Sequence, residues 1–307
     1  MVYKAKRANI AKPFVKWAGG KGNILSQLES LLPSDLYKKD ITYIEPFVGG
    51  GAMFFYLLQK FKNISKAVIN DINPDLIHCY KLIKDNPKEL IERLKDLSCN
   101  YNSNDVQEKR DLYYACRDKY NQEGINVDER AALFLFLNHT CFNGLYRVNR
   151  AGKYNVPYGR YKRPLLCDEN TIWNDHRILN SIDVVIREPG DYKLVLRHLS
   201  KKNKNFVYLD PPYRPLYNTS NFNSYFCNPF GDEQQEELKN FCDKLGDAGC
   251  MIMLSNSDSK DSRGNSYFEE LYKGYSFHRI VAPRYINANP QKRTKLEEIV
   301  ITNYGKK

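Results

Sequence analysis

One segment near the N-terminus limits the possible folds more than any other part of this chain. It begins with an apolar run, 41–45, which predicts a strand, and continues with the turn Gly49-Gly50-Gly51 and an apolar helix over 52–58. A second apolar run, 66–70, predicts another strand that ends at Asp71. Strand, glycine turn, helix and strand in this order are typical of the start of a doubly wound α/β sheet.

The remaining chain alternates between helical and strand-like segments. Residues 79–138 are polar with a helical pattern, and residues 139–180 predict a loop. Further apolar runs and turn signals predict strands over 182–186, 206–209, 250–254 and 298–302 and a helix over 232–245 that Gly246 ends. We therefore expect an α/β domain built from residues 1–78 and 181–307, interrupted by a mainly helical module over residues 79–180.

Composition excludes several classes of protein. With 307 residues, of which 42% are hydrophobic and 27% charged, the chain has the composition of a folded protein. It has no apolar run of about 18 residues that would predict a membrane span, and its basic N-terminus lacks the apolar core of a signal peptide. The eight cysteines include no C-x-x-C pair and do not cluster with histidines. This pattern favours reduced thiols in a cytoplasmic protein without a bound metal.

The distribution of charge points to a nucleic-acid partner. The formal net charge is +11, and no acidic residue occurs between His139 and Cys167. The basic residues of that stretch are Arg147, Arg150, Lys153, Arg160, Lys162 and Arg163. Interleaved asparagines and tyrosines add groups that hydrogen-bond to bases or stack on them. A solvated basic loop stays open as the alternative.

The ends of the first two predicted strands carry groups suited to a nucleotide-like ligand. Glu45, the glycine turn and Asp71 meet at the edge of an open α/β sheet where ligands bind. Asp71 lies about 20 residues past the turn, at the spacing of an acidic residue that binds a ribose. Phe54 stands where a dinucleotide fingerprint requires its third glycine, which disfavours a nicotinamide cofactor. A turn without a ligand stays open.

A second glycine segment is Trp17-Ala18-Gly19-Gly20-Lys21. It is not a phosphate-binding loop, because Gly22 stands where such a loop requires Ser or Thr. Trp17 is suited to pack over a sulfonium or an adenine, and Lys21 to pair with a carboxylate. The alternative is a Trp that is simply buried.

Asp210-Pro211-Pro212-Tyr213 directly follows a predicted strand. An adenine N6 amine is a weak nucleophile, because its lone pair is delocalised into the ring. The Asp210 carboxylate and the carbonyl of Pro211 are suited to accept its two hydrogens and aim it at a methyl donor. The Tyr213 ring is suited to stack on a base turned out of the duplex.

Together these motifs resemble those of the Dam-type, or D12-class, adenine-N6 DNA methyltransferases, in the motif order of their alpha group. The resemblance covers nearly the whole chain. It rests on Phe14 to Lys21, Tyr43 to Ala52, Asn70 to Asn73, Cys141 to Pro164, Asp210 to Tyr225 and Arg284 to Tyr304. It implies a Rossmann-like S-adenosylmethionine-dependent methyltransferase sheet with an inserted helical DNA-recognition domain, 79–180, that carries a basic hairpin over 139–165.

The resemblance also implies a cofactor site and a catalytic set. The residues that would line S-adenosylmethionine are Trp17, Ala18, Gly19, Gly20, Lys21, Glu45, Pro46, Phe47, Gly49, Gly51, Asp71, Ile72, Asp191, Tyr192 and Asp210. Glu45 and Phe47 would hold the methionine end. Asp71 and Ile72 would hold the ribose and adenine, and Asp191-Tyr192 would meet the adenine. The catalytic set would be Asp210, Pro211, Pro212 and Tyr213.

Within the basic stretch, Phe142 to Asn149 and Tyr154 to Pro157 resemble the hairpin by which Dam-type enzymes bind GATC. Arg147 would then hydrogen-bond a guanine in the major groove. Leu145 and Pro157 would touch thymine methyl groups, and Phe142 would wedge beside the flipped adenine. The expected DNA contacts are Phe142, Asn143, Leu145, Arg147, Asn149, Asn155, Pro157, Arg160 and Lys162, with Lys12, Arg293 and Lys295 as further candidates for phosphate contact.

The sequence therefore predicts an adenine-N6 DNA methyltransferase that acts on a flipped-out adenine in duplex DNA, within GATC. A nicotinamide-dependent oxidoreductase is disfavoured by the missing third glycine. An inactive DNA-binding relative is disfavoured because residues 210–213 are all intact. Double-stranded DNA is the expected partner and no membrane is expected, while a separate restriction endonuclease, and a monomer or a weak dimer, are left open.

Overall fold

The computed structural model describes residues 10–103, 105–214, 230–259, 266–282 and 296–305. Arg293 and Lys295, two of the candidate phosphate contacts, lie outside these residues, as do parts of the segments 210–225 and 284–304. In the described part of the chain, no helix is long and apolar enough to cross a membrane.

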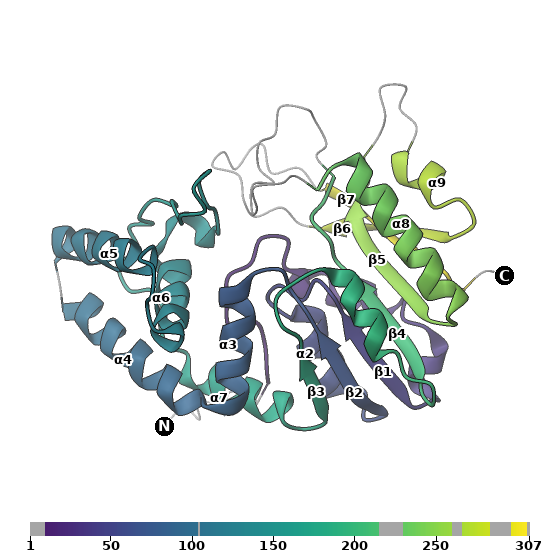
Figure 1. Ribbon diagram of the computed structural model, residues 1–307, viewed down its shortest axis with the longest axis horizontal. Coiled ribbons are helices and arrows are strands. Elements are labelled where there is room, and N and C mark those ends of the chain that lie inside the picture. The colour runs from purple at the N-terminus through teal and green to yellow at the C-terminus, as the bar shows by residue number, and fades with distance from the viewer. Residues whose placement is uncertain (1–9, 104, 215–229, 260–265, 283–295, 306–307) are drawn as a thin grey trace, which may run out of the picture.

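A seven-stranded mixed sheet forms one half of the molecule (Figure 1). Its strands are β1 (Ile41–Glu45), β2 (Ile64–Ile69), β3 (Asp183–Ile186), β4 (Lys204–Leu209), β5 (Met251–Ser257), β6 (Ser276–Ala282) and β7 (Leu296–Thr302). They lie in the order β3-β2-β1-β4-β5-β7-β6, in which β7 runs antiparallel to both of its neighbours. The six strands expected from the sequence are all present, and β6 was not expected.

Helices cover the sheet and form a separate layer beside it. In chain order they are η1 (Lys21–Asn23), α1 (Leu25–Glu29), η2 (Ser34–Tyr37), α2 (Ala52–Lys60), α3 (Pro74–Asp85), α4 (Pro87–Ser103), α5 (Val106–Tyr120), α6 (Val127–Thr140), η3 (Phe142–Gly144), α7 (Glu169–Leu179), η4 (Tyr192–His198), α8 (Asp232–Asp247) and α9 (Tyr267–Leu271). Local capping explains several starts. The side chain of Asn73 accepts the Leu76 N–H before Pro74 begins α3, and Asp105 and Glu108 form a capping box for α5.

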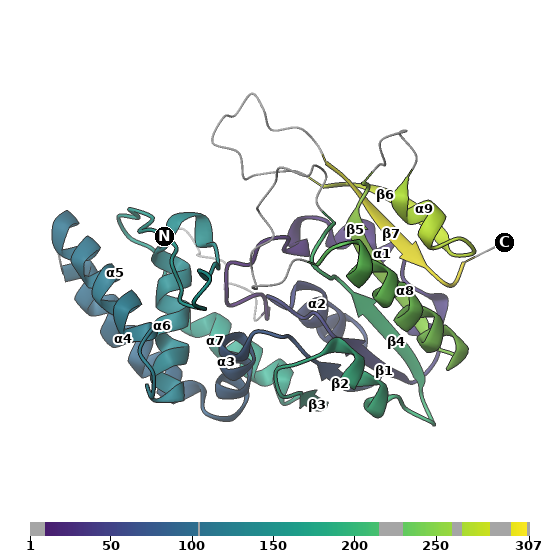
Figure 2. The ribbon, with the colours of Figure 1, turned by 45° about the horizontal axis from the view of Figure 1, so that its top comes forward.

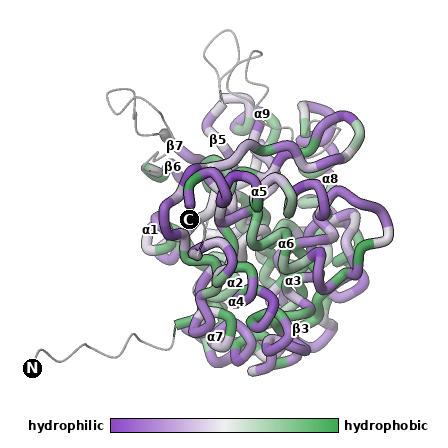
Figure 3. Tube along the Cα trace, turned by 90° about the vertical axis from the view of Figure 1, so that its left-hand side faces the viewer, coloured by the Kyte–Doolittle hydropathy of each residue, from purple (hydrophilic) through white to green (hydrophobic). Residues whose placement is uncertain are grey.

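The helices α4, α5 and α6 stand beside the sheet, on the far side of α3 (Figures 1 and 2). Nine residues of α6 are buried, because this helix packs against α3, α4 and α5. Figure 3 shows hydrophobic segments, drawn in green, concentrated around α2, α3 and α6. An all-round apolar helix such as α6 is typical of a core position.

A helix replaces part of the loop that was expected in the helical module. The loop expected over 139–180 is wrong in part: α7 is a helix that the side chain of Asp168 caps by accepting the Thr171 N–H. The polar composition hid its buried face, which includes Ile172 and Leu179. The expected domain boundary after residue 78 falls inside α3, a helix that packs against both α6 and α7. The recognition role of the module stays a prediction.

Candidate active site and DNA-facing surface

The strands β1 and β4 lie side by side, and the strand order reverses between them. After β1 the chain continues to β2 and β3 on one side, whereas β5 and the later strands lie on the other. Ligands of open α/β sheets bind outside the carboxyl ends of strands at such a switch point. Glu45 ends β1 and Asp210 follows β4, so both expected site residues lie there.

The glycine turn after β1 is held by Asp71. The Gly49 amide donates to Oδ2 of Asp71 at 3.0 Å, and the Asn73 amide donates to Oδ1 at 2.9 Å. Burial raises the pKa of Asp71 to about 6, although these backbone hydrogen bonds lower it. Asp71 therefore shapes the turn directly, a role that the sequence analysis did not assign to it.

Two glycines of this turn accept no side chain. Gly49 has φ +48°, and a Cβ there would lie 2.8 Å from the ring of Trp17. Gly51 has φ +74°, and its Cβ would lie 2.4 Å from the Tyr80 hydroxyl. Trp17 is half-buried and stacks on Tyr146 with ring centroids 6.0 Å apart. The ring of Trp17 thus connects the glycine turn to the basic hairpin.

Glu45 is only 2% exposed. The Tyr43 hydroxyl donates to its Oε2 at 2.7 Å, and no described residue forms an ion pair with it. Burial raises the pKa of Glu45 well above its ordinary value, while Lys21 acts in the opposite direction. A ligand ammonium placed here would offset the cost of burying this carboxylate.

Apolar side chains lie beside the turn. Phe47 packs against Tyr192 with ring centroids 5.0 Å apart, and Ile72 is 53% exposed although it follows a buried strand. The amide of Asn70 donates to the carbonyls of Pro46 at 3.3 Å and Gly190 at 2.9 Å. These hydrogen bonds connect the segment after β1 to the segment before η4. Asp191 caps η4 by accepting the Lys193 N–H. The hydroxyl of Tyr192 is buried and has no partner among the described residues.

Asp210 and Lys21 form an ion pair, with Nζ 2.9 Å from Oδ1. Lys21 is 3% exposed and also donates to the carbonyl of Gly19 at 2.7 Å. The turn that precedes it is closed by the Gly20 amide, which donates to the carbonyl of Trp17 at 3.2 Å across Ala18. Burial raises the pKa of Asp210 to about 6, Lys21 lowers it, and Glu298 of β7 raises it.

The rest of the 210–213 segment is held by residues that the sequence analysis missed. The carbonyl of Pro212 accepts from Nε2 of Gln235 at 3.3 Å, and the amide of Asn256 donates to Gln235 in turn. Pro211 is buried, and no described residue donates to its carbonyl. The Tyr213 hydroxyl donates to Oε2 of Glu298 at 2.9 Å. A buried Gln or Asn shows no local sequence signal, so these partners were not predictable.

The basic hairpin is built around Arg147 and Asn155. Nε of Arg147 donates to Oδ1 of Asn155 at 2.8 Å, and the Asn155 amide donates back to the Arg147 carbonyl at 3.1 Å. At the tip, Oδ1 of Asn149 accepts the Lys153 amide at 3.0 Å. Two isolated antiparallel β-bridges, Val148 with Tyr154 and Cys141 with Tyr158, join the two sides of the hairpin. Asn149 and Asn155 thus fix the hairpin, in addition to the DNA contacts expected of them.

The base of the hairpin is fixed to the N-terminal loop. Asn138 accepts the Lys16 amide at 2.8 Å and donates to the carbonyls of Lys16 at 2.8 Å and Gly144 at 3.3 Å. Beside it, Phe142 is 49% exposed, and its amide donates to the carbonyl of exposed Pro157 at 2.9 Å. Asn143 is exposed with φ +54°, and Leu145 is half-buried.

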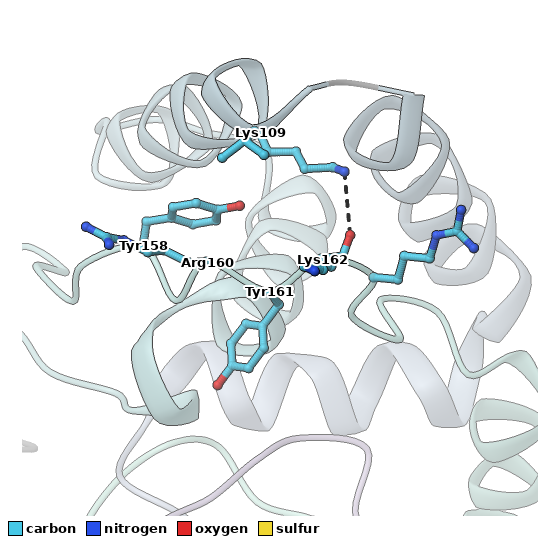
Figure 4. A pocket seen from close by; sticks show the side chains of 7 residues that line it. Lys109, Tyr158, Arg160, Tyr161 and Lys162 are labelled. Atoms are coloured by element: carbon cyan, nitrogen blue, oxygen red, sulfur yellow. Dashed lines mark hydrogen bonds between the residues drawn. The ribbon is translucent and has the colours of Figure 1, made fainter. Parts of the chain in front are cut away.

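A pocket of about 420 Å³ lies where the hairpin meets α5 (Figure 4). Lys109 reaches over it and donates to the carbonyl of Lys162 at 3.5 Å. The residues that line it are Val106, Lys109, Tyr158, Arg160, Tyr161, Lys162 and Arg163. None of its four basic side chains forms an ion pair with a described acidic residue. The pocket belongs to the helical module and contains no residue of the 210–213 segment.

The cysteines and acidic residues form no site of their own. Each cysteine in the described segments is a free thiol, with most of them buried. Across those same segments, no group of three or more His, Cys, Asp or Glu side chains is placed to hold a metal ion.

Several known proteins are similar in sequence to this chain over nearly its full length. A type II methyltransferase, M.MjaIII of Methanocaldococcus jannaschii, is 45% identical over 297 residues, which cover 95% of this chain and 99% of the relative. M1.LlaDCHI of Lactococcus lactis subsp. cremoris, also a type II methyltransferase, is 40% identical over 96% of each chain. The DNA adenine methylase of Escherichia coli K12 is 31% identical over 94% of each.

A family model also matches, over residues 17–286, and its description is D12 class N6 adenine-specific DNA methyltransferase. The matched segment includes the glycine turn, Lys21, the basic hairpin and Asp210. The chain belongs to the D12 class of adenine-specific DNA methyltransferases, a family that uses S-adenosylmethionine to methylate the N6 amine of adenine in DNA.

Proposed function

We propose that this protein methylates the adenine of GATC in duplex DNA after turning that base out of the helix. The observation that carries the proposal is the place of Asp210: a carboxylate at the switch point of the sheet, beside the open carbonyl of Pro211 and the ring of Tyr213. These are the acceptors and the stacking surface that an adenine amine needs for methyl transfer.

The described residues fit S-adenosylmethionine, which supplies a methyl group on a sulfonium when it is bound. Glu45 is a buried carboxylate without an ion-pair partner in the described structure, suited to the ammonium of the methionine end. Gly49 and Gly51 let the turn pack directly against Trp17 and Tyr80, where a Cβ would clash. The apolar side chains of Phe47, Tyr192 and the exposed Ile72 are suited to pack against an adenine ring. Asp71, a buried carboxylate at the turn that accepts the Gly49 and Asn73 amides, is the candidate for the ribose hydroxyls.

In the proposed reaction, Asp210 and the Pro211 carbonyl accept the two amine hydrogens and so direct the nitrogen lone pair toward the methyl group. Asp210 must be ionised to do this, since a protonated carboxyl would offer its own hydrogen to the amine. The amine loses a proton only after it has attacked, when its nitrogen carries a positive charge. Gln235 and Asn256 keep the segment in place during these steps.

We assign DNA recognition to the helical module, residues 79–180, and its hairpin, 139–165. Arg147 is held by its hydrogen bond to Asn155 across the hairpin and is suited to a guanine edge in the major groove. Phe142, exposed at the base of the hairpin, is suited to fill the space that the adenine leaves. Arg160 and Lys162, exposed and without ion pairs in the described structure, are suited to phosphates.

GATC is the finer part of the proposal. It rests on the hairpin sequence and on the relatives that are named DNA adenine methylases. The relatives named type II methyltransferases are more similar to this chain than those named DNA adenine methylases. The proposed reaction is compatible with both roles, a solitary methylase or a methylase that works alongside a separate restriction endonuclease.

Transfer of tritiated methyl from S-adenosylmethionine to duplex oligonucleotides tests the function. We expect label in N6-methyladenine for a GATC duplex and at least tenfold less label for duplexes in which one base pair of the site is changed. Label in a methylated pyrimidine would contradict the proposed reaction, and equal label in all duplexes would contradict GATC. If the protein binds S-adenosylmethionine but transfers no label to any duplex, the remaining interpretation is an inactive DNA-binding relative.

A further inference from the structure

One ammonium occupies the position that the substrate amine requires. Lys21 Nζ lies 2.9 Å from Oδ1 of Asp210, where a bound adenine amine would donate its hydrogen. The same nitrogen lies 4.8 Å from the centroid of the Tyr213 ring, over the face on which a base would stack. Lys21 therefore competes with the proposed substrate for both groups.

A second carboxylate lies within reach of that ammonium. Oε2 of Glu298, on the antiparallel strand β7, is 3.9 Å from Lys21 Nζ and accepts the Tyr213 hydroxyl at 2.9 Å. Glu298 is held on the sheet by its register opposite Ser257 of β5 and Ile280 of β6. It is only 14% exposed, so its attraction for a cation is little screened by water.

We infer that Glu298 is a positioning residue for methyl transfer, which draws Lys21 away from Asp210 when the adenine amine arrives and holds the Tyr213 ring through its hydroxyl. This inference rests on the proposed role of Asp210. Lys21 is 3% exposed, so an ammonium that leaves Asp210 without another partner would be buried and unpaired. A neighbouring carboxylate gives it a second partner, so the ion pair with Asp210 is exchanged and no ammonium is left buried without a partner.

The surroundings of Asp210 make this exchange measurable. The charged or titratable groups that act on it or are acted on by it are Lys21, Tyr213, Glu298, Glu45, Tyr43 and Tyr208. Among them, Glu298 is an anion that raises the pKa of Asp210, and Lys21 is the cation that lowers it. Removing the charge of Glu298 leaves Lys21 entirely to Asp210, so the pKa of Asp210 must fall.

Glu298→Gln is the informative variant, because its amide oxygen still accepts the Tyr213 hydroxyl while the charge is gone. We would follow the Asp210 carboxyl by ¹³C NMR titration of the DNA-free enzyme, with the signal assigned through its loss in Asp210→Asn. The expected result is a midpoint below that of the parent protein. In parallel, kcat should fall by about tenfold to a hundredfold, with the KM for S-adenosylmethionine within twofold.

Two variants keep the test falsifiable. Glu298→Asp retains the charge and should keep more activity than Glu298→Gln, and Glu270→Gln, an exposed carboxylate on α9, should leave both readouts unchanged. An unshifted Asp210 midpoint in Glu298→Gln overturns the inference, even if activity is lost, because that loss would be structural. The Asp210 midpoint could shift in Glu298→Gln even though the unmodified protein methylates a base other than adenine. That combination would support the positioning role of Glu298 and reject adenine as the substrate.

Discussion

Lys21 and Asp210 form a nearly buried ion pair that joins the N-terminal glycine segment to the carboxyl end of β4. The two residues are 189 positions apart in sequence (210 minus 21), and neither motif alone indicates the contact. In the proposed reaction a substrate amine reaches the same carboxylate, so the pair would couple the ionisation of Asp210 to catalysis.

The rate should depend on pH through Asp210. Burial raises the pKa of this carboxyl to about 6, and only the carboxylate accepts the amine hydrogens. We expect kcat/KM for DNA to be constant above pH 7 and to fall tenfold per pH unit well below pH ~6. Steady-state rates from pH 5 to 8, with folding checked by circular dichroism, provide the measurement. A midpoint near the ordinary aspartate pKa of about 4 would disagree with the burial of Asp210.

Replacing Gly49 by Ala should damage the cofactor site. The left-handed conformation costs an Ala about 1–2 kcal/mol, and the clash of its Cβ with Trp17 adds about 1–3 kcal/mol. Gly124→Ala is a matched control, because Gly124 has φ +72° with nothing within 4 Å. Urea unfolding and calorimetric titration with S-adenosylmethionine should show a larger loss of stability, and weaker cofactor binding, for Gly49→Ala alone. Equal losses in the two variants would mean that the contact with Trp17 is unimportant.

The elements at the switch point were predictable because their signals are local. Apolar runs bounded by turns identified β1, β2 and β4, and the segment 210–213 was expected at a strand end, where it lies. The strand β6 was missed because the polar residues His278 and Arg279 interrupt its apolar residues, so that no continuous apolar run indicates a strand. The helix α7 was missed because its buried face includes Asn174 and Asp175, which look like loop residues in sequence.

Partners brought together by tertiary structure were not predictable. Nothing in the neighbourhood of Glu298 or Gln235 in sequence indicates that these side chains meet Tyr213 and Pro212. Their roles depend on the sheet order, in which β7 inserts antiparallel between β5 and β6. The sequence therefore predicted the groups proposed to react, and the structure was needed to find the side chains that hold them.

Arg147→Ala should relax the preference for one base pair of the recognition site. Losing a bidentate contact to guanine costs about 1–3 kcal/mol of discrimination. Asn155→Ala should have a smaller effect in the same direction, because Asn155 holds the guanidinium in place. Methylation rates on a panel of single-base-pair variants provide the measurement, with Arg93→Ala on α4 as a control outside the hairpin. Unchanged preference in Arg147→Ala would remove this assignment.

The basic side chains around the α5 pocket should account for part of the salt dependence of DNA binding. Replacing Arg160, Lys162 and Arg163 by Ala should reduce the slope of log K against log salt by about 0.9 for each phosphate that the variant no longer neutralises. Fluorescence anisotropy at four salt concentrations measures that slope.

The matched control removes three positive charges near the amino ends of the strands, opposite the carboxyl ends where the candidate site lies. Lys38, Lys39 and Lys62 are exposed near the amino ends of β1 and β2, so their replacement by Ala should leave the slope close to that of the parent. If both triple variants reduce the slope equally, general charge explains binding and the hairpin surface has no special role.

The most direct test of the account is the methylation rate of Asp210→Asn on a GATC duplex, measured as N6-methyladenine formed per enzyme in a single turnover. Asn keeps the shape of the side chain but loses the charge that the amine requires. We predict a rate at least about a hundredfold below that of the parent, with S-adenosylmethionine still bound. An Asp210→Asn enzyme that forms N6-methyladenine as fast as the parent would contradict it.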